Sequence, residues 1–144
     1  MNNKEVILNQ WLEKAFHDEQ AFFVLLEHGK KLGLLDVVAF HAQQAVEKWL
    51  KAIIIFYDAE PPRTHNLLRL LDLASELSSH IDTETNYSLA RQLNDFAVDF
   101  RYPNDEEILG TFVYPDFEVT KENLLIFKKL AYTILNSSDL NFTP

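Results

Sequence analysis

The chain contains no cysteine, and this absence excludes several kinds of site at once. It can form no disulfide bond, no thiolate metal site and no cysteine nucleophile. Proteins without such bonds are typical of the reducing cytosol, so we expect a cytoplasmic protein. The N-terminal stretch mixes charged residues into its apolar ones and lacks the apolar run of a signal peptide.

Glycine and proline are also scarce, with 3 and 5 among 144 residues. Turn residues do not recur at the spacing of short strands, which argues against a β-sandwich or a barrel. Long apolar runs are missing as well, since the longest, AIIIF, is far shorter than a membrane span. The length fits a single domain, residues 1–144, that can bury a core without covalent cross-links.

A basic surplus is lacking too, because the formal net charge is −9. Proteins that bind long nucleic acids need many Lys and Arg side chains for phosphate contacts. We therefore expect no extended nucleic-acid partner, although a local basic patch could bind a small anion. The patterns GxGxxG, GxSxG, HExxH and GxxxxGK followed by Ser or Thr are absent, and no cofactor is predicted.

What the chain does have is apolar periodicity at three- and four-residue steps, which is typical of amphipathic helices. The first such segment is expected to bury one face that includes Phe16 and Phe23, and Thr64 is the expected N-cap of the third. The pattern predicts an all-α, antiparallel up-and-down bundle of four to five helices. The five segments are approximately Lys4–Lys31, Leu35–Asp58, Thr64–Leu77, Thr83–Phe100 and Lys121–Leu135.

The second segment carries polar residues beside its apolar stripe. His41, Gln44, Lys48 and Lys51 are three, four and three residues apart, so they share one flank of the helix. This flank could face a groove and bind a phosphate or the edge of a base. The other interpretation is a solvated flank, supported by an ordinary ion pair between Glu47 and Lys51.

The run PPRTHNL gives a second candidate. With Thr64 as the cap, His65 would lie in the first helical turn, where free N–H groups favour anions. Alternatively, this run simply starts a helix.

The run DFAVDFRYP gives a third candidate. Asp95 and Asp99 lie one turn apart, but a hard cation needs more oxygen ligands, so no metal site is predicted. Arg101 could pair with Asp99 or with a phosphate of a ligand.

The stretches FHAQQAVEKWLKA, PPRTHNLLRLL and DFRYP, in this order, resemble the HEPN domain family over roughly Trp11 to Leu135. The resemblance implies a helical bundle that dimerises through a helical face and often works with a minimal nucleotidyltransferase, sometimes as a toxin and antitoxin. For the branch with these three motifs it also implies nucleotide binding. Carried over by position, the candidate pocket is His41, Gln44, Lys48, Lys51, His65, Arg101 and Tyr102.

Many HEPN proteins are metal-independent ribonucleases in which an Arg is followed, after four to six residues, by a His. The Arg would stabilise charge on the phosphate, and the His would transfer a proton. This chain has Arg at 63, 69, 91 and 101, and no His follows any of them at that spacing. We therefore predict no catalytic residues and favour a binding role over an enzyme.

Three functions remain open from the sequence. The first is a dimeric module that binds a nucleotide or phosphate ligand beside a nucleotidyltransferase partner. The second is a divergent ribonuclease toxin, which needs His41 or His65 close to Arg101. The third is a structural protein in which the polar flank is a dimer seam supported by exposed aromatic residues. If the protein is itself nucleotidylated, Tyr102 is the first residue to check.

Overall fold

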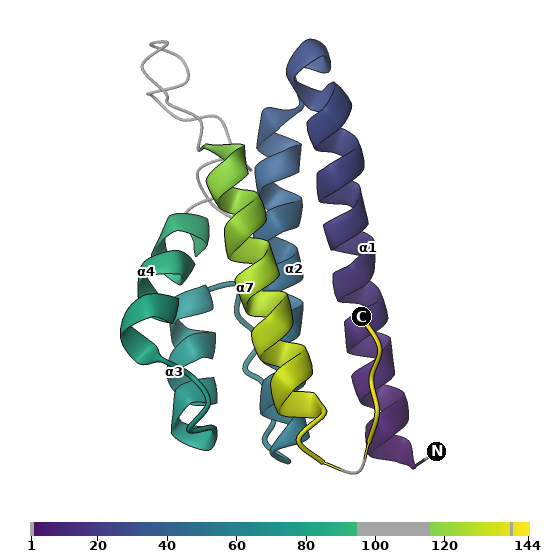
Figure 1. Cartoon of the computed structure of the whole chain (residues 1–144), viewed down its shortest axis with the longest axis vertical. Coiled ribbons are helices and arrows are strands. Elements are labelled where there is room, and N and C mark those ends of the chain that lie inside the picture. The colour runs from purple at the N-terminus through teal and green to yellow at the C-terminus, as the bar shows by residue number, and fades with distance from the viewer. Residues whose placement is uncertain (1, 95–115, 139) are drawn as a thin grey trace.

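The computed structural model describes residues 2–94, 116–138 and 140–144, and these ranges contain five helices and no strand (Figure 1). The predicted all-α bundle is therefore confirmed. No helix in these ranges is long and apolar enough to span a membrane. The end of the fourth predicted segment, with Asp95 and Asp99, lies outside the described residues. The helices are α1 (Asn3–Leu32), α2 (Leu35–Phe56), α3 (Leu67–Leu77), α4 (Thr83–Asn94) and α7 (Phe117–Leu135).

Helices α1 and α2 form a long antiparallel hairpin (Figure 1). Helix α1 ends at Gly33, whose φ of 71° lies in the left-handed region that side chains with a Cβ disfavour. The N–H of Gly33 donates to the carbonyl of Gly29, and the basic Lys30 and Lys31 occupy the last turn. This turn lets α2 begin at once and fold back along α1.

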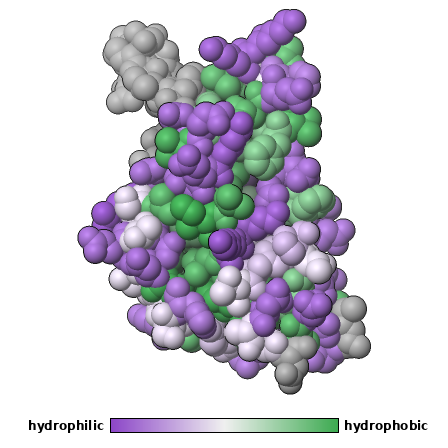
Figure 2. Space-filling view, viewed as in Figure 1, coloured by the Kyte–Doolittle hydropathy of each residue, from purple (hydrophilic) through white to green (hydrophobic). Residues whose placement is uncertain are grey.

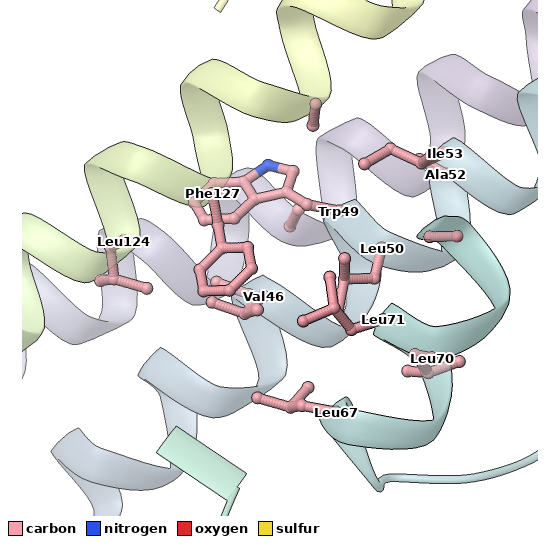
Figure 3. Close-up of a cluster of buried hydrophobic side chains, with 14 of the residues drawn as sticks. Val46, Trp49, Leu50, Ala52, Ile53, Leu67, Leu70, Leu71, Leu124 and Phe127 are labelled. Atoms are coloured by element: carbon pink, nitrogen blue, oxygen red, sulfur yellow. The ribbon is translucent and has the colours of Figure 1, made fainter. Parts of the chain in front are cut away.

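Helix α2 lies at the centre of the bundle, in contact with α1, α3, α4 and α7. Its apolar side chains are buried on several sides, because neighbouring helices cover more than one face of it. Figure 3 shows Trp49 and Val46 packed beside Phe127 of α7, with the leucines of α3 on another side of α2. The position of α2 explains why its sequence is the most apolar of the five.

Helix α3 runs in the same direction as α2. Its beginning lies beside the middle of α2, where Gln43 Nε2 donates to the carbonyl of His65 at 2.7 Å. Its end lies beside the end of α2, where the hydroxyl of Tyr57 donates to Ser78 Oγ at 3.1 Å. The chain from residue 58 to 66 therefore runs back along α2 and brings His65 to its polar flank.

The predicted N-cap of α3 is wrong by two residues. The helix begins at Leu67, and Asn66 Oδ1 accepts from the N–H groups of Leu68 and Arg69 at 3.0 and 3.3 Å. Thr64 Oγ1 instead accepts from the N–H of Asn66, as in a turn before the helix. Because Asn94 Oδ1 also accepts from Leu67, side chains already occupy the N–H groups of the first turn. The alternative that the run PPRTHNL simply starts a helix therefore fits better than the candidate anion site.

The apolar face of α1 is narrower than predicted. Leu8, Leu12 and Phe22 are buried, but Phe16 and Phe23 are 47% and 41% exposed. The reason is that α1 packs mainly against α2, so its flanks stay open. Figure 2 shows a hydrophobic area over the middle of α7, bordered by hydrophilic side chains. The exposed large apolar residues are Val6, Ile7, Phe16, Phe23, Val24 and Leu32 of α1 and Val119, Leu125 and Ile126 of α7.

Candidate functional site

Asp18 of α1 binds two of the predicted residues of α2. One carboxylate oxygen lies 2.8 Å from His41 Nδ1, and the other accepts a hydrogen bond from Lys48 Nζ. The Asp18 side chain is only 14% exposed. Its partners are 23 and 30 residues away, so the contacts depend on the hairpin between α1 and α2. The sequence contains one sign of this role. Asp18 is a carboxylate on the apolar face of α1, in register with Leu8, Ala15 and Phe22.

The environment of Asp18 keeps its carboxyl group ionised. Burial on its own raises the pKa of Asp18. Hydrogen bonds from His41 and Lys48, together with the charge of Lys48, lower the pKa by more than burial raises it. The resulting pKa lies below the usual value of an aspartate. Asp18 is therefore a fixed negative charge between the two helices.

Glu47, which lies between His41 and Lys48 on α2, forms a second centre of ion pairs. Its Oε1 accepts from Lys51 Nζ at 2.8 Å, and its Oε2 lies 2.9 Å from His65 Nδ1. The predicted pair of Glu47 and Lys51 is thus confirmed. However, their side chains are 5% and 11% exposed, so the interpretation of a solvated flank is wrong. The flank is covered by α1 and by the segment that precedes α3 of the same chain.

Gln44 joins the two centres. Its Nε2 donates to Glu47 Oε2 at 2.9 Å and to Gln43 Oε1 at 2.7 Å, and its Oε1 accepts from Lys48 at 3.4 Å. Gln43 in turn donates to the backbone of His65. No buried side-chain nitrogen or oxygen in the described ranges lacks a partner. We call this set the α2 polar network: Asp18, His41, Gln43, Gln44, Glu47, Lys48, Lys51 and His65.

The charges of the α2 polar network balance. Asp18 and Glu47 are paired with Lys48 and Lys51, so the network has no net charge when both histidines are neutral. The lysines of the predicted flank are therefore neutralised within the protein. An anionic ligand needs a further cation nearby, or it must compete with these carboxylates.

A hollow of about 340 Å³ lies beside the network, between α1 and α2. Gln10, Trp11 and Lys14 line it from α1, and Lys48 lines it from α2. Lys48 therefore belongs to both the hollow and the network. Gln10, Trp11 and Lys14 were not predicted as site residues, because the partner helix that closes the hollow is distant in sequence.

A second hollow, of about 450 Å³, lies on the outer side of α7 near the C-terminal residues. It includes Lys128, Lys129 and Tyr132 and contains no residue of the predicted site. Lys128 is paired with Glu19 at 2.9 Å. Burial raises the pKa of Tyr132, and the negative charge of Glu19 raises it further.

The structure brings five of the seven predicted pocket residues together. His41, Gln44, Lys48, Lys51 and His65 all belong to the α2 polar network. Arg101 and Tyr102 lie outside the described residues. Within the described ranges, no group of three or more His, Asp or Glu residues is arranged to hold a metal ion.

Comparison with known proteins places this geometry in context. The family model described as HEPN domain matches residues 8–138, which is most of the chain. No curated protein and no solved structure matches the chain. The matched range includes Asp18, the whole of α2 and His65.

Proposed function

Because this chain belongs to the HEPN domain family, we propose that it is a binding module for a nucleotide or another phosphate-bearing ligand. The observation that carries the proposal is the α2 polar network, which shares Lys48 with the adjacent hollow. Buried polar groups are costly unless they are fully paired, and here the pairing fixes several donors at one place. Such fixed donors are suited to binding a polar ligand with little reorganisation.

The donors that a ligand could reach are at the edge of the network. Lys48 has three N–H donors. Two of them donate to Asp18 and Gln44, so one remains for a ligand. His41 and His65 bind carboxylates through Nδ1, and within the described residues their Nε2 atoms make no hydrogen bond. Arg101 and Tyr102 belong to the proposed pocket through the resemblance of DFRYP alone.

A panel of nucleotides, tested by thermal shift and calorimetry on the purified protein, tests the proposal. A ligand at 100 times its dissociation constant should stabilise the protein by about 2.7 kcal/mol. The variant Lys48→Ala should lose most of this gain, whereas Lys121→Ala, at an ion pair on α7, should keep it. No shift with any nucleotide or with pyrophosphate, from a well-folded protein, would remove the proposal.

We also propose that the protein is a homodimer that works with a minimal nucleotidyltransferase. Support comes from the exposed large apolar residues, which lie on α1 and α7. In contrast, Gln44 and Glu47 are buried within one chain, which argues against the polar flank as a dimer seam. Among the described aromatic residues only Phe16 and Phe23 are exposed, so few of the aromatic side chains are available for that third interpretation.

A divergent ribonuclease of a toxin and antitoxin pair is the second candidate. It is favoured by the two histidines, because a carboxylate on Nδ1 orients the ring and leaves Nε2 to transfer a proton. The side chain of His65 is 59% exposed and therefore within reach of RNA. Growth arrest on expression that His65→Ala relieves would support this activity, and intact RNA after incubation with folded protein would exclude it.

A further inference from the structure

The hollow beside the α2 polar network has a lining that the network does not explain. Trp11 contributes an aromatic ring, Lys14 and Lys48 contribute ammonium groups, and Gln10 contributes an amide. Its volume of about 340 Å³ is at the small end of the range of ligand sites. We infer that this hollow binds the aromatic base of a nucleoside phosphate against Trp11, with Lys14 and Lys48 at the phosphate. The inference rests on the proposed function and names the ligand class of the same site.

The position of Trp11 is tied to the α2 polar network. Lys51 Nζ lies over its ring, 5.8 Å from the centroid, and Lys51 is itself held by Glu47. A cation at this distance attracts the ring and limits its movement. Trp11 is therefore a half-buried, oriented aromatic surface, and such surfaces bind bases of any sequence by stacking.

Lys14 supplies the positive charge that the network lacks. It is exposed and forms no ion pair with any residue in the described ranges, whereas Asp18 neutralises Lys48. Lys14 lies one helical turn after Gln10, and both face the hollow. An anion here gains the attraction of Lys14 without displacing a carboxylate. A flat apolar group combined with an anion is the chemistry of a nucleoside phosphate.

The hollow on α7 fits this ligand less well, although it also contains an aromatic ring and lysines. There Glu19 neutralises Lys128, as Asp18 neutralises Lys48, and Lys129 forms no ion pair within the described ranges, so charge does not separate the two hollows. The hollow on α7, however, shares no residue with the α2 polar network. The two hollows therefore differ in their connection to the network, although both contain an aromatic ring and two lysines.

Tryptophan fluorescence of the full chain tests the inference, because the chain has two tryptophans and Trp49 is 1% exposed. Titration with ATP or GTP, excited where nucleotides absorb little, should quench the emission of Trp11. Pyrophosphate and ribose 5-phosphate should bind without this quenching. The single-tryptophan variant Trp49→Phe should keep the response.

Calorimetry separates the contribution of the base from that of the phosphate. Trp11→Ala should weaken ATP binding by about fivefold or more, because a stacked base is lost, and should leave pyrophosphate binding unchanged. Lys14→Ala should weaken the binding of both ligands, and Lys30→Ala, an exposed lysine further along α1, should affect neither. If Trp11→Ala does not fold, the quenching measured in Trp49→Phe shows whether the base binds against Trp11.

Two results would overturn the inference, and they can be told apart. Equal ATP affinity in the wild type and Trp11→Ala, without quenching in Trp49→Phe, would refute the base site and leave the proposed function intact. Failure of the wild type to bind ATP, GTP and pyrophosphate would refute both.

Discussion

At the scale of the residue, Asp18 is the contact on which the hairpin and the candidate site both depend. It is buried against α2, yet it stays ionised because His41 and Lys48 offset the cost of its burial. Removing one partner from such a group leaves the other buried charge without compensation. The side chain therefore links the stability of the fold to the charge of the site.

We expect Asp18→Asn to lower the free energy of unfolding by about 1–3 kcal/mol at neutral pH. Since the pKa of Asp18 is lowered in the folded state, its contribution is complete above the unfolded value of about 3.9 and is lost as pH falls through the folded value. Urea unfolding of both proteins between pH 7 and strongly acidic pH measures this. The difference between them should shrink below pH about 4, and a difference that stays constant with pH would contradict the prediction.

The residues of the site could be predicted only in part. The spacing of His41, Gln44, Lys48 and Lys51 on one helix put them on one flank, which needs no tertiary information. Asp18 and Trp11 could not be assigned this way, because their roles arise from a neighbouring helix. A buried carboxylate becomes recognisable only when its partners are known.

At the scale of the element, apolar periodicity predicted the five helices, but their ends depend on local hydrogen bonds. Thr64 and Asn66 are both residues that cap helices, and the sequence does not distinguish them. The predicted up-and-down order does not hold for α3, which runs in the same direction as α2. Residues 58–66, at about 3.3 Å each when extended, are long enough to run back along the last turns of α2. Contacts such as the hydrogen bond between Gln43 and the carbonyl of His65 fix the direction of α3.

The start of α3 gives a prediction that separates the two possible caps. Asn66→Ala should cost about 1 kcal/mol, because two N–H groups lose their acceptor. Thr64→Ala should cost less, since its hydroxyl accepts a single bond outside the helix. Chemical denaturation of the two variants measures both values. A larger loss for Thr64→Ala would mean that the helix begins earlier.

At the scale of the whole molecule, the distribution of exposed apolar side chains is uneven. The large ones belong to α1 and α7, whereas the central α2 exposes none among the described residues. Patches of this kind on a small protein commonly mark an interface. A dimer built through these two helices would leave the α2 polar network inside each protomer.

We expect the wild-type protein to have the mass of a dimer by light scattering. Phe16→Glu on α1 and Leu125→Glu on α7 should each shift the mass toward the monomer, because a charge is costly in an apolar interface. Arg91→Glu, at an exposed position of α4, serves as the control and should remain dimeric. A monomeric wild type, or dimers that persist in both variants, would exclude this interface.

The central position of α2 has a consequence for the kinetics of recognition. Because four other helices pack against it, its amide protons should exchange with solvent only when the entire bundle unfolds. Network residues anchored on this helix are then already in place before a ligand arrives. Association should involve little loss of chain entropy, and differences in affinity between ligands should reflect how long each stays bound.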